Sequence, residues 1–232
     1  MSGGKATLYG VGVGPGDPEL LTLKAVRIIE RCEAIAVPRT SRGATVALDI
    51  VRGAVDLEGK EIVYLDFAMS RDPSVVEEGH RVAAKRIVAQ LEQGRDVAML
   101  NLGDVSIFAT YSRMKAMVEE AGYPTSRIPG VPSFCAAAAV LDCDLTPRMD
   151  APLHIVPAGW GDLSGALALD GTKVVMKAGS DLPALKKLLK QMGSYEKASL
   201  VCDCGLPGQS VSRSLDDAED EGSYFATMVV HP

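Results

Sequence analysis

The chain has 232 residues, of which 47% are hydrophobic and 23% are charged, and its formal net charge is −6 at pH 7. This composition is ordinary for a globular domain, and the negative charge argues against a nucleic-acid partner bound through the overall field. No apolar run approaches the ~18 residues of a membrane span, and the N-terminus lacks a signal-peptide pattern. We therefore expect no membrane partner and a cytoplasmic protein with reduced cysteines.

The chain begins with a strand, a glycine-rich turn and a helix. Residues 6–13 are apolar and β-favouring, and residues 19–32 show the apolar spacing of an amphipathic helix. Residues 14–18, GPGDP, join the two. Asp17 suits the N-cap of the helix and Pro18 its first turn.

This turn does not match the common nucleotide-binding fingerprints. A Rossmann turn needs G-x-G-x-x-G, but the third glycine position falls on Pro15 when counted from Gly10, and on Asp17 when counted from Gly12. A P-loop needs a lysine that is absent here. The expected second strand, residues 34–38, also lacks the acid that a dinucleotide site would place at its end.

Strand and helix patterns alternate through the rest of the chain, which predicts an α/β protein with a largely parallel sheet. A change of composition near residues 121–124 favours two α/β domains, 1–121 and 122–232. Further helices are expected at 45–51, 73–93, 106–122 and 136–141, and further strands at 61–65, 96–104, 125–128, 154–158, 172–178, 198–203 and 224–230.

Three of the expected strand ends carry glycine and lie before a helix. They are residues 14–17, 102–108 and 129–133. Each alone is compatible with a simple turn. Because ligands of open α/β sheets bind beyond the carboxyl ends of strands, three together favour one pocket with backbone amides, a carboxylate and small side chains. Such a set suits a nucleoside-bearing ligand.

The same segments resemble a known family. GVGVGPGDPELLTLKA, GDVSIFATY and PGVPSFCAAAA are similar, in order and spacing, to the three signatures of the class III, or tetrapyrrole, S-adenosylmethionine methyltransferases. LDFAMSRD, the early VPR and CGLPGQS resemble the C20-methylating branch of that family. Val105 stands where many relatives have proline. The resemblance implies two α/β domains with an active-site cleft between them, a homodimer, and a cofactor near Gly103–Asp104.

The resemblance also implies a reaction in cobalamin biosynthesis. S-adenosyl-L-methionine would donate a methyl group to a meso carbon of precorrin-2 or cobalt-factor II, leaving S-adenosyl-L-homocysteine. Positioning of the reacting atoms contributes most of the catalysis expected for such a transfer. A carboxylate, a tyrosine or water must take the proton that leaves. Asp104 is the first catalytic candidate, and Tyr111 and Asp66 are weaker ones. Their structural alternatives are a helix cap, a core tyrosine and a solvated acid.

Two sets of binding residues follow from matching the motifs. The substrate carries many carboxylates while the chain is acidic, so arginines are expected to meet it. The cofactor set is Pro15, Leu102, Gly103, Asp104, Ile107, Pro132, Ser133, Met176, Lys177, Cys204 and Gly205. The substrate set is Gly14, Gly16, Asp17, Arg39, Met69, Arg71 and Arg148.

Other functions stay open on the sequence. A uroporphyrinogen III methyltransferase shares the first signature, and a non-catalytic tetrapyrrole-binding protein would share the sheet. The missing acid after residues 34–38 counts against a class I methyltransferase and a nicotinamide oxidoreductase. The three histidines have no metal-ligand spacing, and Cys202 and Cys204 make only a weak metal site. We therefore expect no metal bound by the protein itself.

Overall fold

The chain divides into two compact units, each with its own five-stranded sheet. The computed structural model describes residues 5–39, 45–67, 70, 72–221 and 223–232. The first unit ends at Pro132 and the second spans Ser133–Pro232. The sequence analysis placed the boundary after residue 121, but the strand Thr125–Ile128 (β5) pairs with the first strand of the chain. This pairing extends the first unit beyond β5.

The sheet of the first unit is parallel throughout, as predicted. Its strands follow the order β3-β2-β4-β1-β5, which differs from the order of a dinucleotide-binding sheet. The pairing puts the carboxyl ends of all five strands at one edge. The bounds of the other four strands are Leu8–Gly12 (β1), Ala34–Arg39 (β2), Glu61–Asp66 (β3) and Val97–Asn101 (β4).

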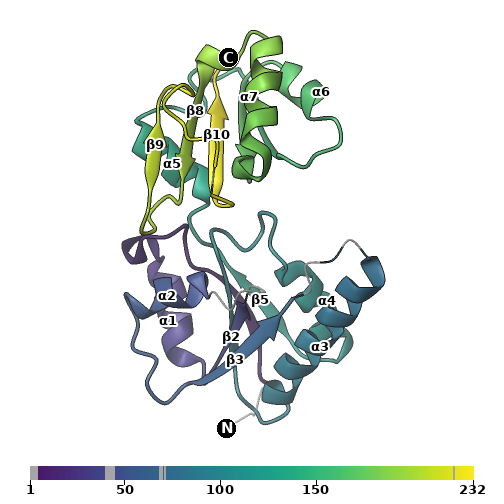
Figure 1. Cartoon of the computed structure of the whole chain (residues 1–232). Helices are drawn as coiled ribbons and strands as arrows, with labels where there is room; N and C mark the ends of the chain where they lie inside the picture. The colour runs from purple at the N-terminus through teal and green to yellow at the C-terminus, as the bar shows by residue number, and fades with distance from the viewer. Residues whose placement is uncertain (1–4, 40–44, 68–69, 71, 222) are drawn as a thin grey trace. The chain divides into compact units, whose positions relative to one another are not determined.

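Helices cover both faces of this sheet (Figure 1). The apolar sides of α3 and α4 pack on alternate strand residues such as Leu8, Val63 and Met99, and α1 and α2 lie on the opposite face (Figure 1). The helices are α1 (Leu23–Arg31), α2 (Val46–Arg52), α3 (Pro73–Leu91) and α4 (Tyr111–Glu120), preceded by a short 3₁₀ turn, η1 (Pro18–Leu20).

Two expected helices start later than predicted. The pattern at 19–32 is split, because Asp17 caps η1 through the backbone N–H of Glu19 while Thr22 caps α1 through that of Ala25. The helix expected at 106–122 begins only at Tyr111. Its first residues stay in a loop because Asp104 accepts hydrogen bonds from Ser106.

The second unit has a mixed sheet, so the prediction of a largely parallel sheet is wrong here. Its strand order is β6-β7-β10-β8-β9. Among the described strand pairs, β6–β7 is parallel and the other three are antiparallel. The last strand, β10, inserts between β7 and β8 in the opposite direction. The strands are β6 (Leu153–Pro157), β7 (Thr172–Met176), β8 (Ala198–Cys202), β9 (Ser210–Ser212) and β10 (Ala226–Val230).

In the described part of the second unit, three α-helices and two 3₁₀ turns accompany the sheet. Residues of α6 and α7 share a core with β7, β8 and β10, and α5 contacts β8 and β10. Within the described residues of either unit, no helix has both the length and the apolar character that crossing a membrane requires. The helical bounds are α5 (Ser133–Leu141), α6 (Leu163–Ala168), η2 (Ala178–Asp181), α7 (Leu182–Gln191) and η3 (Tyr195–Lys197).

Candidate functional site

The carboxyl edge of the first sheet brings together the glycine-bearing ends of β1, β4 and β5. Gly14 and Gly103 form a backbone bridge, in which each amide donates to the carbonyl of the other, at 3.2 and 2.7 Å. Both residues have positive φ, 79° and 71°, a conformation that glycine adopts without steric cost. Two of the three predicted strand ends therefore meet through their backbones.

Gly12 and Gly130 bring the third strand end into the same contact. A Cβ on Gly12 would lie 2.6 Å from the amide nitrogen of Gly130, and a Cβ on Gly130 would overlap the carbonyl oxygen of Gly103. From the sequence, the three glycine-bearing strand ends were expected to form one ligand pocket. At these two positions the space beside the glycine is filled by backbone, so the glycines serve the packing of one loop on another.

Asp104 connects two of these loops. One carboxylate oxygen accepts from the Gly130 amide at 2.9 Å, and the other accepts from the amide of Ser106 at 2.8 Å and from its hydroxyl. Only 9% of Asp104 is exposed. Burial raises its pKa, but the hydrogen bonds from Ser106 and Gly130 outweigh burial and hold the pKa below its ordinary value. Asp104 is thus an ionised carboxylate that fixes the β4 loop to the β5 loop.

The other predicted residues at this edge differ in exposure. Pro15, Gly14 and Gly16 are buried, and the carboxylate of Asp17 is used in capping η1. Four predicted residues that lie two or three positions from Asp104 or Gly130 along the chain are partly exposed, which leaves their side chains able to contact a ligand. They are Leu102, Ile107, Pro132 and, at the start of α5, Ser133.

An ion pair closes the β2–β3 end of the same edge. Arg39 and Asp66, paired across β2 and β3, form two hydrogen bonds of 2.8 and 3.0 Å. Arg86 donates to the Tyr64 carbonyl at 2.7 Å and lies 3.5 Å from Asp66. The hydrogen bond from Arg39 lowers the pKa of Asp66. Asp66 therefore lies at the predicted edge as a carboxylate already paired with arginine.

Tyr111 lies in the core of the first unit. Its ring packs against Gly10, where a Cβ would overlap it. Its hydroxyl donates to the Ser126 carbonyl at 2.7 Å, and no part of the residue is exposed. Burial raises the pKa of Tyr111. These contacts match the structural alternative, a core tyrosine.

The predicted residues of the second half gather at one edge of the second sheet. Met176 ends β7 and pairs with Thr227, while Cys202 ends β8 and pairs with Ala226 on the same strand. Lys177, Cys204 and Gly205 follow these two strand ends directly. Lys177 has a φ of 59° and Gly205 a φ of 77°.

Two further residues at this edge were missed by the sequence analysis. Asp203, with φ of 50°, accepts from the Ser223 hydroxyl at 2.6 Å. The ammonium of Lys177 lies 5.5 Å from the ring centre of Tyr224. Both contacts depend on β10 lying between β7 and β8, which the parallel-sheet expectation did not include.

Of the remaining predicted substrate residues, one is described, and it is not part of these two edges. Arg148 is exposed in the second unit and pairs with Asp150 and Asp170 at 3.6 and 3.2 Å. Met69 and Arg71 lie outside the described residues.

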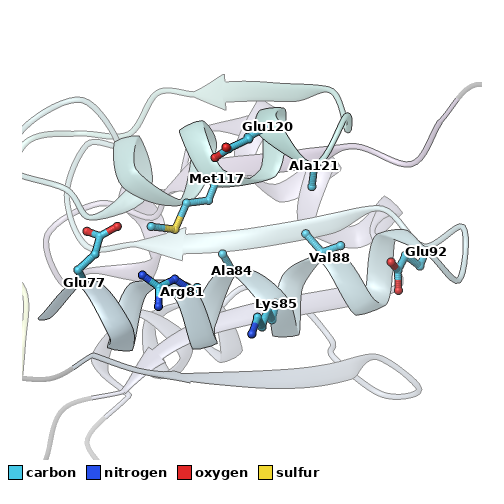
Figure 2. A pocket seen from close by; sticks show the side chains of 9 residues that line it. All are labelled: Glu77, Arg81, Ala84, Lys85, Val88, Glu92, Met117, Glu120 and Ala121. Carbon is cyan, nitrogen blue, oxygen red and sulfur yellow. The ribbon is translucent and has the colours of Figure 1, made fainter. Parts of the chain in front are cut away.

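A groove of about 750 Å³ lies between α3 and α4, and Figure 2 shows the side chains that line it. None of its lining residues was predicted as a site residue, and its charged side chains are of both signs. They are Glu77, Arg81, Ala84, Lys85, Val88, Glu92, Met117, Glu120 and Ala121.

The chain is similar to known proteins along nearly its whole length. Residues 7–218 match the family model of the tetrapyrrole (corrin/porphyrin) methylases. The chain is 30% identical over 230 residues to a cobalt-precorrin-2 C(20)-methyltransferase of Salmonella typhimurium, covering 97% of this chain and 95% of that protein. It is 27% identical over 242 residues to a precorrin-2 C(20)-methyltransferase of Sinorhizobium, covering 99% and 97%.

Solved structures show the same fold. A cobalt precorrin-4 methyltransferase superposes with a TM-score of 0.78 at 20% identity, covering 100% of this chain and 97% of that one. A uroporphyrin-III C-methyltransferase from Thermus thermophilus, complexed with S-adenosylhomocysteine, superposes with a TM-score of 0.69 at 25% identity, covering 97% and 92%. The two-unit α/β architecture predicted from the sequence is therefore confirmed.

Proposed function

Because this chain belongs to the tetrapyrrole (corrin/porphyrin) methylases, we propose that it methylates C20 of precorrin-2 or of cobalt-factor II in cobalamin biosynthesis, with S-adenosyl-L-methionine as the methyl donor. The observation that carries the proposal is similarity along nearly the whole chain to two C20-methyltransferases. Their names differ in whether the substrate contains cobalt. That difference lies at the centre of the ring, and the motifs of this chain do not distinguish the two substrates.

The residues of the first edge fit the cofactor chemically. When bound, S-adenosylmethionine supplies a methyl group on a sulfonium, which departs to an electron-rich carbon. Leu102, Ile107 and Pro132 offer partly exposed apolar surface for the nucleoside and thioether. Ser133 adds a hydroxyl. We also keep Met176, Lys177, Cys204 and Gly205, at the second edge, as cofactor contacts in this proposal.

In the proposed reaction the protein mainly orients the reacting groups. Asp104 holds the loops of β4 and β5 in one arrangement through its hydrogen bonds to Ser106 and Gly130, which keeps the surrounding side chains in place for an in-line transfer. A carboxylate with a lowered pKa is a weak general base. With Asp66 paired to arginine and Tyr111 buried, we assign the final proton transfer to water.

The best alternative is a uroporphyrinogen III methyltransferase, since structures of that activity share the fold. A test supplies the purified chain with S-adenosylmethionine and, separately, uroporphyrinogen III, precorrin-2 and cobalt-factor II. The position of the new methyl group is assigned by NMR. We expect methylation at C20 of precorrin-2, of cobalt-factor II or of both. We expect no methylation of uroporphyrinogen III. Methylation of uroporphyrinogen III alone would replace the proposal by the alternative.

A calorimetric titration with S-adenosylhomocysteine distinguishes an enzyme from a non-catalytic tetrapyrrole-binding protein, which has no need of a cofactor site. We expect binding by the purified chain, and we expect Gly103→Leu to abolish it, because Gly103 combines a positive φ with a place beside Asp104. Unchanged affinity in the variant, with an intact circular dichroism spectrum, would remove Gly103 from the cofactor site. The proposal also includes a cytoplasmic homodimer. Light scattering measures the mass of the particle in solution and so tests whether it is a dimer.

A further inference from the structure

Phe108 combines two unfavourable features. It has a φ of 48°, a left-handed conformation that is a genuine outlier for a bulky residue. It is also 51% exposed, so its ring is not held by the core. The other non-glycine residues with positive φ in the described ranges are Asp142, Lys177 and Asp203, which are polar. A single exposed apolar side chain is ordinary, but one held in a strained backbone is not.

The surroundings of Phe108 explain how this conformation persists. Four residues earlier, Asp104 accepts from the Ser106 amide and from Gly130, and the Ile107 amide donates to the Asp104 carbonyl at 3.4 Å. Three residues later, α4 begins with Tyr111, which is fully buried. The loop is therefore fixed at both ends, and the ring of Phe108 is directed to solvent at the carboxyl edge of the sheet.

Backbone strain that the surrounding structure maintains is concentrated at functional sites. We propose that Phe108 is a substrate-contacting residue, whose ring packs against the flat face of the tetrapyrrole. This inference rests on the proposed function for the class of substrate. The conjugated part of a tetrapyrrole presents an extended apolar π surface, and an aromatic ring held out by a rigid loop can stack on it at little entropic cost.

The substrate is a better occupant than the cofactor for this ring. The apolar side chains proposed for the cofactor are those of Leu102, Ile107 and Pro132. They lie close in sequence to Asp104 and Gly130, whose hydrogen bond joins the two loops, and they are only partly exposed. Phe108 is more exposed than these and leads away from the Asp104 contact toward α4. Its surface is also apolar and without charge, so it complements the ring plane, while the carboxylates require the arginines.

The test replaces the aromatic ring while relieving the strain. Asn tolerates the left-handed region, so Phe108→Asn is expected to leave the melting temperature unchanged or raise it by about 2–4 °C. The same variant is expected to raise KM for the tetrapyrrole about tenfold, with the Kd for S-adenosylhomocysteine unchanged. Phe108→Tyr keeps the ring and is expected to retain the wild-type KM.

Asp142→Gly is the matched control, because Asp142 is also left-handed, with φ of 56°, but follows α5 and carries no proposed ligand contact. It is expected to leave KM unchanged. A fall in melting temperature for Phe108→Asn with no change in KM would show that the ring only stabilises the fold. A rise in the Kd for S-adenosylhomocysteine would assign the ring to the cofactor. Either result overturns the proposal.

A second measurement separates this inference from the proposed reaction. Uroporphyrin III is a flat polycarboxylate tetrapyrrole that needs no methyl transfer, and its binding is followed by its own visible absorption. If the wild type methylates neither precorrin-2 nor cobalt-factor II but binds uroporphyrin III, and Phe108→Asn weakens that binding, the reaction assignment fails and the role of Phe108 stands. If the wild type turns over either substrate and Phe108→Asn binds and reacts normally, the role of Phe108 fails alone.

Discussion

Asp104 shows how a residue predicted for one role acquires another through its contacts. The sequence marked it as an acid at a strand end, suited to a ligand or to proton transfer. In the structure its oxygens accept from Ser106 and from Gly130, which lies 26 residues further along the chain. The pairing of β5 with β1 creates this contact, so local sequence could not reveal it. A direct contact of Asp104 with cofactor stays a prediction.

The low pKa of Asp104 makes a prediction for stability against pH. A carboxyl group whose folded pKa lies below its ordinary value of 3.8 stabilises the fold above that value, and the contribution is lost as pH falls through the folded pKa. Asp104→Asn places an amide donor toward another donor and should cost about 2 kcal/mol near neutral pH. The difference in unfolding free energy from wild type should shrink as the pH falls below about 4.

Urea unfolding at several pH values measures this difference. Asp49→Asn is the control, since Asp49 is exposed on α2 and pairs with Arg52, which is exposed as well and lies one turn away. Its effect should be small at every pH. A penalty for Asp104→Asn that stays constant down to acid pH would mean that the ionised form is not what stabilises the loops.

At the scale of the elements, capping explains where the first helices begin. Thr22 accepts from the Ala25 amide at 3.1 Å and so starts α1. Thr45 occupies the same position before α2 but makes no capping hydrogen bond. The two threonines form a matched pair, because they share residue type and place but differ in the contact.

Thr22→Ala should therefore destabilise the protein by about 1 kcal/mol, and Thr45→Ala by much less. Thermal or urea unfolding of the two variants beside wild type measures the difference. Equal losses would indicate that the effect comes from the threonine methyl group or from the contact of Thr22 with the Pro129 carbonyl, and not from the cap.

Element boundaries were harder to predict than element types. The long apolar runs at β1, β2 and β4 were identified because every residue of β4, for example, is buried. The start of α4 was predicted too early because the sequence SIFAT, residues 106–110, is compatible with a helix. In the structure these five residues form a loop, which is set by the hydrogen bonds of Asp104 and by the left-handed conformation of Phe108.

At the scale of the whole molecule, charge sets a further prediction that rests on the proposed substrate. The chain carries a net charge of −6, while the proposed tetrapyrrole is a polycarboxylate, so local arginines must bind it. Arg39 is the described candidate at the first edge, and its guanidinium is shared with Asp66. Contacts of this kind are screened by salt.

We expect KM for the tetrapyrrole to rise several-fold between about 50 and 300 mM salt, while the Kd for S-adenosylhomocysteine changes little. Arg39→Gln should flatten this dependence. Arg52→Gln, on an exposed turn of α2 and paired with Asp49, should not. Equal salt sensitivity for both ligands would count against a substrate bound through arginines.

The sequence by itself determined the family of this protein and the type of most of its helices and strands. Apolar periodicity, the glycine-bearing strand ends and the three signatures all lie within short stretches, and each depends on local chemistry. Cys32, in an apolar segment, is buried, and burial raises its thiol pKa to about 12. Cys135, in the apolar sequence of α5, is exposed, because composition alone does not identify the covered face of a helix.

Only the tertiary structure decided which of these local features meet. The Gly14–Gly103 bridge joins residues 89 positions apart, and the Arg39–Asp66 pair joins residues 27 apart. The reversed β10, which places Tyr224 beside Lys177, also has no local signal. Such contacts follow from strand order and direction, and these are fixed by the burial of two whole sheets, a property that no short stretch of sequence carries.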